Sequence, residues 1–224
     1  MATVPRQQRR EGAAAVLRGV SFKQYERLIR HPGNRHLRMA YRDGTLEIMS
    51  PTLPEHEDSS ARIRLIVTTV GDVLGLRYQG TGSLTVRKRG NGPLQGVGRE
   101  PDQSFYLQNV DRRPAKGRVP DLADGGLPPD LWVEVDNRVS SRARLPTYAR
   151  LGVPEVWQYR VGPNKVRFLR LDGEQYRPLD RSIALPVLTP ALVAAALQHG
   201  GDLIESDWAR WLRAWAEQFR PPVA

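Results

Sequence analysis

Two acidic residues in strand-like surroundings are the first candidates for chemistry. Glu134 lies within "LWVEVD", whose large and β-branched residues predict a buried strand, and Asp102 follows Pro101 in "EPDQSF". A buried carboxylate without a partner is costly, so Glu134 needs a cation beside it. Two carboxylates at one place would suit Mg²⁺ or Mn²⁺, hard ions that take oxygen ligands and waters. The alternative is an ordinary ion pair between Glu134 and an arginine.

The spacing of the two acids indicates how they would meet. They lie 32 positions apart, which is too far for one local motif such as a calcium loop. Adjacent strands of one sheet would still bring both side chains to the same edge. The chain has no cysteine, which excludes thiolate metal sites and cysteine nucleophiles. It also has no histidine pair with zinc spacing and no phosphate-loop motif.

The elements that must position these acids are helices and strands in mixed order. We expect a flexible basic arm over residues 1–20 and a single domain over residues 21–224. Helices are expected over residues 21–31, 54–76, 140–152 and 206–220. Strands are expected over residues 36–44, 45–51, 77–88, 99–109, 131–136, 154–161, 165–173 and 174–180, the first two joined at a hairpin signal, Asp43-Gly44. The last helix is amphipathic and rich in tryptophan, and its aromatic stripe favours packing over base stacking.

The charge of the chain favours a polyanionic partner. The net charge is +10, and residues 1–50 hold ten basic against four acidic residues, a surplus of six. Such a surplus is typical of proteins that bind DNA, although the arginine-rich surface of an ordinary protein would look the same. No apolar run is long enough to span a membrane and no signal sequence is visible, so we expect a cytoplasmic protein without membrane contact.

Several segments together resemble a known family. "YRDGTLEIMSPTLPEHE", "EPDQSFYLQN", "PDLWVEVD" and "RLPTYARLGVPEVWQY" are similar, in unchanged order, to the Uma2 family, formerly DUF820. This family belongs to the PD-(D/E)XK, restriction-endonuclease-like superfamily, and the resemblance runs over roughly residues 20–195. It implies an α/β fold with a restriction-endonuclease-like mixed β-sheet flanked by helices, a divalent metal, and hydrolysis of DNA phosphodiesters.

The resemblance also assigns roles to individual residues. Asp102 would be the acid of the first motif and Glu134 the second metal ligand, while the carbonyl of Val135 would complete the inner shell. The superfamily's lysine, two residues past the glutamate, is replaced here by Asp136. Family members carry a basic residue on the following helix instead, and in this chain that residue is Arg144.

Arg144 is the main departure from the family pattern. Its guanidinium group suits phosphate and would stabilise developing charge, but it does not release a proton near neutral pH. If a lysine is needed for more than its charge, the chain would be a catalytically degenerate relative that binds nucleic acid or a protein partner without cleaving it. A metal-dependent phosphohydrolase acting on small nucleotides is a third hypothesis.

Other residues of the family motifs have weaker candidate roles. Glu57 would add an acid in the first turn of a helix, or would simply be a solvated helix-start residue. His56 would contact phosphate or water, or would only cap or pack. Glu47 would make a supporting hydrogen bond, and Tyr148 favours helix packing. Asp136 would join a second metal or pair with an arginine.

The sequence therefore predicts a Mg²⁺- or Mn²⁺-dependent DNA endonuclease. Its candidate catalytic residues are Asp102, Glu134, Arg144, Glu57 and His56, with Asp102, Glu134 and Val135 as metal ligands. Cleavage of both strands of a duplex needs two sites, which makes a homodimer a reasonable expectation.

Overall fold

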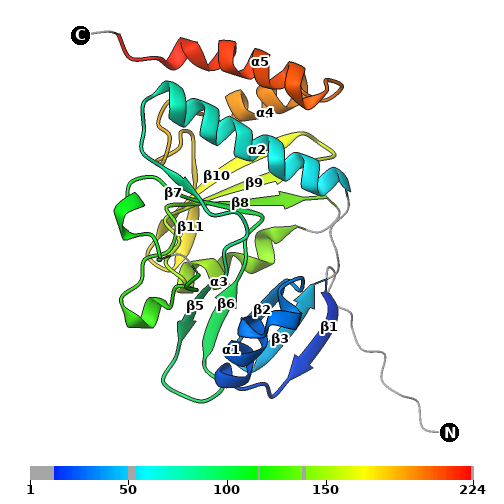
Figure 1. Cartoon of the computed structure of the whole chain (residues 1–224), viewed down its shortest axis with the longest axis vertical. Helices are drawn as coiled ribbons and strands as arrows, with labels where there is room; N and C mark the ends of the chain where they lie inside the picture. The colour runs from blue at the N-terminus through cyan, green and yellow to red at the C-terminus, as the bar shows by residue number, and fades with distance from the viewer. Residues whose placement is uncertain (1–12, 50–53, 116, 138–139, 223–224) are drawn as a thin grey trace, which may run out of the picture.

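Two β-sheets, each accompanied by helices, make up the fold (Figure 1). The computed structural model of the protein describes residues 13–49, 54–115, 117–137 and 140–222. The architecture is mixed α/β, as predicted, but the strands divide between two sheets instead of forming one central sheet. The candidate site lies where these two sheets approach each other.

The first sheet is antiparallel throughout and has five strands. Its order is β1 (Ala13–Arg18), β3 (Thr45–Met49), β2 (Met39–Arg42), β6 (Gly96–Arg99) and β5 (Val86–Arg89). Helix α1 (Phe22–Arg30) packs on it through Phe22 and Tyr25. A Cβ atom on Gly98 would lie 2.1 Å from the Tyr25 hydroxyl oxygen, so only glycine lets the helix approach β6 this closely.

The second sheet is mixed and has six strands. Its order is β11 (Gln175–Leu179), β10 (Lys165–Asp172), β9 (Glu155–Arg160), β8 (Leu131–Asp136), β7 (Gln103–Tyr106) and β4 (Gln79–Gly80). Only β8 and β9 run parallel, and all other neighbours are antiparallel. All six residues of β8 are buried, because both faces of this strand are covered.

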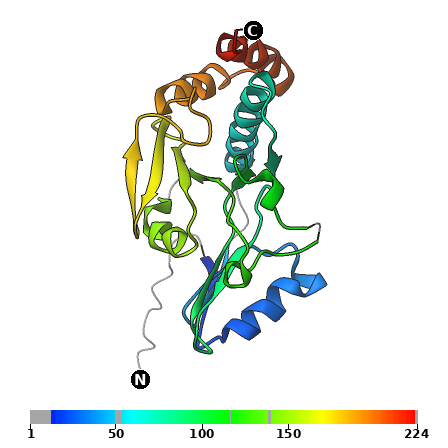
Figure 2. The ribbon, with the colours of Figure 1, turned by 90° about the vertical axis from the view of Figure 1, so that its left-hand side faces the viewer.

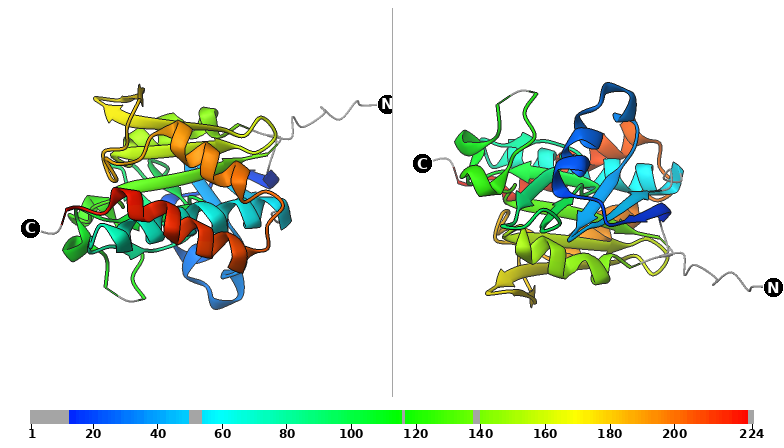
Figure 3. Two further views of the ribbon diagram at one scale, coloured as in Figure 1. Left: turned by 90° about the horizontal axis from the view of Figure 1, so that it is seen from above. Right: turned by 90° about the horizontal axis from the view of Figure 1, so that it is seen from below.

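Helices cover the two faces of the second sheet unequally. Helices α2 (Pro54–Val73), α4 (Pro190–His199) and α5 (Glu205–Ala216) form a layer over one face (Figure 2 and Figure 3, left). Residues 131, 133 and 135 of β8 point into that layer and join the largest core cluster. The alternating residues Trp132 and Glu134 point to the other face, toward helix α3 (Leu145–Arg150), which contacts both β6 and β11.

Three sequence-based expectations need correction. Residues 13–18 of the predicted arm form β1, because they pair with β3, while residues 1–12 lie outside the described residues. The Gly-rich segment that follows β5 contains strand β6 as well as a turn. Helix α4 was not predicted. Trp208 of α5 is fully buried and the rest of its aromatic stripe packs on the core, in agreement with the packing interpretation.

No helix in the described part of the chain combines the length and the apolar character that spanning a membrane requires.

Candidate active site

Asp102 and Glu134 lie on neighbouring strands at the point where the ladder between β7 and β8 ends. The pairing of Gln103 with Val133 leaves Asp102, one residue before β7, beside Glu134. The Asp102 N–H donates to the Val133 carbonyl at 3.1 Å. The Val135 N–H donates to Asp102 Oδ2 at 2.7 Å, so a carboxylate replaces the next ladder partner. The structure thus brings the two predicted acids together through adjacent strands.

Two basic side chains hold the Asp102 carboxylate. Arg38 Nη1 lies 2.9 Å from Oδ1, and His56 Nε2 lies 3.2 Å from Oδ2. Burial on its own raises the pKa of Asp102, but the hydrogen bond from His56 and the charge of Arg38 outweigh it and lower this pKa to about 2. Asp102 is therefore a permanent anion at neutral pH.

Glu134 is in a different environment. Its side chain is only 1% exposed, and Oε2 accepts a hydrogen bond from Arg144 Nη1 at 2.9 Å. The other oxygen, Oε1, is buried without a hydrogen-bond partner among the described residues. Burial, followed by the negative charge of Asp102, raises the pKa of Glu134 in spite of Arg144. The alternative interpretation of Glu134 as the partner of an arginine thus describes this structure.

Arg144 is positioned by a short turn that Asp136 anchors. It ends the 3₁₀ helix η4 (Ser141–Arg144), which follows β8 closely. The carboxylate of Asp136 accepts hydrogen bonds from the Ser141 N–H at 2.8 Å and from its hydroxyl at 3.2 Å. Gln158 Nε2 donates to the same hydroxyl oxygen at 2.7 Å. Asp136, for which a second metal or an arginine partner was expected, holds this turn through Ser141.

His56 and Glu57 enter the site from the first turn of α2. Pro54 opens this helix, and the His56 side chain is largely buried against Asp102. Burial lowers the pKa of His56, but its hydrogen bond with Asp102 and the charge of that residue outweigh it and raise the pKa. His56 Nδ1 lies 3.6 Å from Glu57 Oε1, and the Glu57 side chain is 64% exposed. His56 therefore contacts a candidate ligand directly, whereas Glu57 lies beside His56 and is mostly exposed.

The remaining motif residues surround this centre. Glu47 Oε2 lies 3.7 Å from Arg99 Nη1, so it supports an arginine. The Tyr148 ring packs edge-on against Trp132 with a centroid distance of 5.1 Å. Its buried hydroxyl has no standard hydrogen bond with a described residue. Burial raises the pKa of Tyr148, and the negative charge of the nearby Glu134 raises it further.

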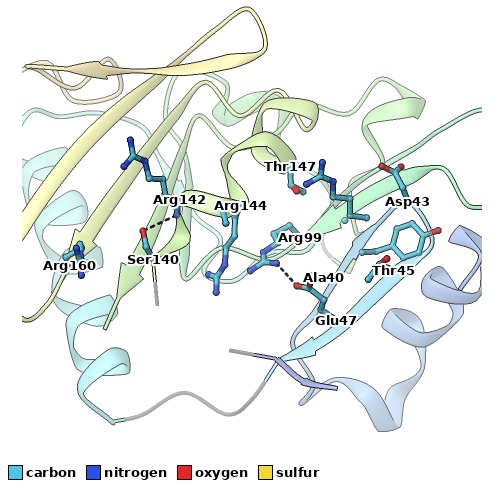
Figure 4. A pocket seen from close by; sticks show the side chains of 14 residues that line it. Ala40, Asp43, Thr45, Glu47, Arg99, Ser140, Arg142, Arg144, Thr147 and Arg160 are labelled. Atoms are coloured by element: carbon cyan, nitrogen blue, oxygen red, sulfur yellow. Dashed lines mark hydrogen bonds and ion pairs between the residues drawn. The ribbon is translucent and has the colours of Figure 1, made fainter. Parts of the chain in front are cut away.

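A cleft of about 1210 Å³ opens between the first sheet and η4, and it adjoins the acid pair through Arg144, which lines it and bonds Glu134 (Figure 4). Arg99 and Arg144 point into the same space from β6 and η4. Three further arginines line the cleft: Arg42, Arg142 and Arg160. These three residues and Arg38 were not among the predicted site residues. Arg38 and Arg42 could have been found, because strand alternation places both of them on one face of the strand.

The donor set was compared with the needs of a divalent metal. Oxygen donors are present in Asp102, Glu134 and the Val135 carbonyl, which faces the Asp102 side because its own N–H does. The unpartnered Oε1 of Glu134 is the kind of buried oxygen that a cation would satisfy. The described residues contain no group of three or more acidic or histidine side chains placed to hold a metal. Two carboxylates and a carbonyl fit Mg²⁺ or Mn²⁺, which take waters or phosphate for the rest of the shell.

A known family and a solved structure are similar to this chain. The model of the Uma2 family, described as "Putative restriction endonuclease", matches residues 22–198. Among solved structures, a crystal structure of a putative nuclease belonging to DUF820 from Anabaena variabilis is similar at 18% sequence identity. That match covers 78% of this chain and 90% of the other, with a TM-score of 0.44. No curated protein matches the sequence.

Proposed function

The chain belongs to the Uma2 family, and on that premise we propose that it is a nuclease that hydrolyses DNA phosphodiesters with a divalent metal. The observation that carries the proposal is the Glu134 carboxylate. It is buried beside Asp102, its Oε1 has no standard hydrogen bond with any described residue although the Tyr148 hydroxyl lies near the carboxylate, and its pKa is raised. Such an arrangement is costly for folding and is typical of functional sites.

Asp102 and Glu134 would hold the metal, with the Val135 carbonyl as a third oxygen donor. When bound, Mg²⁺ or Mn²⁺ polarises a phosphate oxygen and lowers the pKa of a coordinated water. The chain itself prepares the donors. His56 and the Val135 N–H orient the Asp102 carboxylate and keep it ionised, and helix α2 fixes the position of His56.

Arg144 would act on the phosphate and not on the proton of the water. Its guanidinium group lines the cleft while it bonds Glu134, so one side chain contacts both the acid and the space for the substrate. Burial lowers the pKa of Arg144, but the negative charge of Glu134 and its neighbours outweighs this effect and raises the pKa. It therefore stays protonated, which suits charge stabilisation and excludes general-base catalysis.

A second candidate function is supported by a separate observation. Arg38 and His56 hold Asp102, and Arg144 holds Glu134, so both carboxylates already have cationic partners from the chain. A protein that binds nucleic acid without cutting it would need no metal at this place. This degenerate-nuclease hypothesis makes the acid pair a structural remnant.

Cleavage and metal binding together test the two hypotheses. Supercoiled plasmid and single-stranded DNA are incubated with Mg²⁺, Mn²⁺ or EDTA, using wild type and an identically purified Glu134→Gln variant. The nuclease hypothesis expects metal-dependent nicking that the variant loses, together with weaker Mn²⁺ binding by the variant. Equal cutting by both proteins would assign the activity to a contaminant or another site. Absence of cutting and of Mn²⁺ binding in both would favour the degenerate protein.

A further inference from the structure

The cleft beside the acid pair has a strongly one-sided charge. Five arginines line it: Arg42, Arg99, Arg142, Arg144 and Arg160. Its two acidic lining residues already have arginine partners, since Asp43 pairs with Arg150 and Glu47 lies beside Arg99. Glu47 therefore offsets one of the five arginines, and Asp43 is offset by Arg150, which does not line the cleft, so a positive surplus remains.

Three of the arginines have no structural task that accounts for them. Arg42 at the end of β2, Arg142 in η4 and Arg160 at the end of β9 are exposed, and none forms an ion pair with another described residue. By contrast, Arg99 and Arg144 are engaged with Glu47 and Glu134 at the floor. Figure 4 shows Arg142 and Arg160 on the side of the cleft away from Glu47.

We propose that Arg42, Arg142 and Arg160 bind the phosphate backbone of a nucleic acid strand in this cleft. The arginines come from three separate elements around a space of about 1210 Å³, which exceeds what one phosphate or a small anion fills. Guanidinium forks match phosphate geometry, and spaced cations suit a polymer with regularly spaced charges. The inference rests on the proposed function, because the strand would then pass the guanidinium of Arg144, which bonds Glu134.

This assignment differs from what net charge alone suggests. The surplus of basic residues in the first 50 positions pointed to the N-terminal third as the DNA-binding part. Only Arg42 of the three comes from that part. Arg142 and Arg160 reach the cleft because η4 follows β8 and because β9 lies parallel to β8, so that both carboxyl ends meet at one edge.

Binding in EDTA tests the inference apart from cleavage. A fluorescein-labelled oligonucleotide is titrated with wild type and with the triple variant Arg42→Gln, Arg142→Gln, Arg160→Gln at 50–300 mM salt. Each phosphate contact contributes about 0.7 to 0.9 to the slope of log K against log salt, so three lost contacts lower the slope by about 2 to 2.7. The same relation gives an affinity loss of about 100-fold or more at 0.1 M salt.

A matched variant separates this loss from a general loss of charge. Arg167→Gln, Arg170→Gln, Arg213→Gln removes three exposed arginines, none of which lines the cleft. We expect it to bind almost as wild type does. Equal losses in the two triple variants, or no binding by wild type, would overturn the inference. A Glu134→Gln variant that still cuts would refute the proposed catalytic site and leave the binding result standing.

Discussion

Replacing Arg144 by glutamine gives a sharp test of the electrostatics at the acid pair. Arg144→Gln removes the cation that bonds Glu134 Oε2 at 2.9 Å and leaves a carboxylate of 1% exposure beside Asp102. Glutamine keeps the first part of the side chain and a polar end, but it is shorter than arginine and carries no charge. We expect a large loss of stability at pH 8 that becomes small near pH 5.

The magnitude follows from the burial of the pair. Removing one partner of a buried ion pair costs about 3–5 kcal/mol of the free energy of unfolding. Because solvent reaches part of the Arg144 side chain, we expect the lower end of this range, about 3 kcal/mol. For a chain of this size the loss corresponds to a fall in Tm of about 6–12 °C. The same loss would raise the pKa of Glu134 further, because the charge of Arg144 now opposes that rise.

The sign of the pH dependence is fixed by the direction of this shift. Burial already raises the pKa of Glu134, so the folded protein binds this proton more tightly than the unfolded chain does. Stability is then lost as pH rises above the unfolded pKa of about 4.3, and the loss is complete above the folded pKa. Since the variant has the higher folded pKa, its deficit relative to wild type grows with pH.

Urea denaturation of both proteins between pH 5 and pH 9 measures this deficit. Arg142→Gln is the matched control, because Arg142 lies in the same turn but forms no ion pair with Glu134. The control should unfold as wild type does at every pH. A deficit of Arg144→Gln that is absent at pH 8, or equal at pH 5 and pH 8, would refute the electrostatic account of the pair.

Further substitutions test other parts of the site and the fold. Arg144→Lys should leave plasmid cleavage unchanged or lower it, and a gain of about tenfold, or 1.4 kcal/mol of barrier, would favour a degenerate site. Burial lowers the pKa of His56, but Asp102 outweighs this effect and raises it. The contribution of His56 to stability is therefore present below about pH 6.5 and is lost as the pH rises through the folded pKa. In urea titrations, His56→Gln should destabilise the protein more at pH 6 than at pH 9. Asp136→Ala removes two hydrogen bonds to Ser141 and should cost about 1–3 kcal/mol in the same assay. Trp208→Ala empties a fully buried site and should cost about 3–5 kcal/mol, seen as a lower urea midpoint.

The parts of the fold that could be predicted are those with a local signal. Strand β8 contains Trp132, Val133 and Val135, which favour a strand. Helix α2 begins with a proline and acidic residues, and α5 has an aromatic stripe, so the sequence indicates both helices. Helix α4 also had such a signal, since Thr189 caps it, Pro190 opens it and Gly200 follows it. The parallel neighbour of β8 and the separation into two sheets had none, because the choice of strand partner depends on distant segments.

The same distinction applies to the site. Asp102 and Glu134 could be singled out because a carboxylate within a strand-like run is unusual. The ion pair of Glu134 with Arg144 depends on a turn that Asp136 closes, and the contact of Arg38 with Asp102 joins the two sheets. Neither contact follows from spacing, because each is fixed by tertiary packing.

The two carboxylates are prepared for different tasks, although they share one site. Asp102 has partners on both oxygens and a pKa of about 2, so it stays charged whatever Glu134 does. Glu134 has one cationic partner, one unpartnered oxygen and a raised pKa, so it is the group that would gain most from a new cation. A metal bound there would compete with Arg144 for Glu134. The guanidinium group of Arg144 lines the cleft, so it would then be available to a phosphate there. If the proposed function holds, Arg144 therefore links metal binding at the acid pair to phosphate binding in the cleft. A lysine at this position would have fewer hydrogen-bond donors for the phosphate.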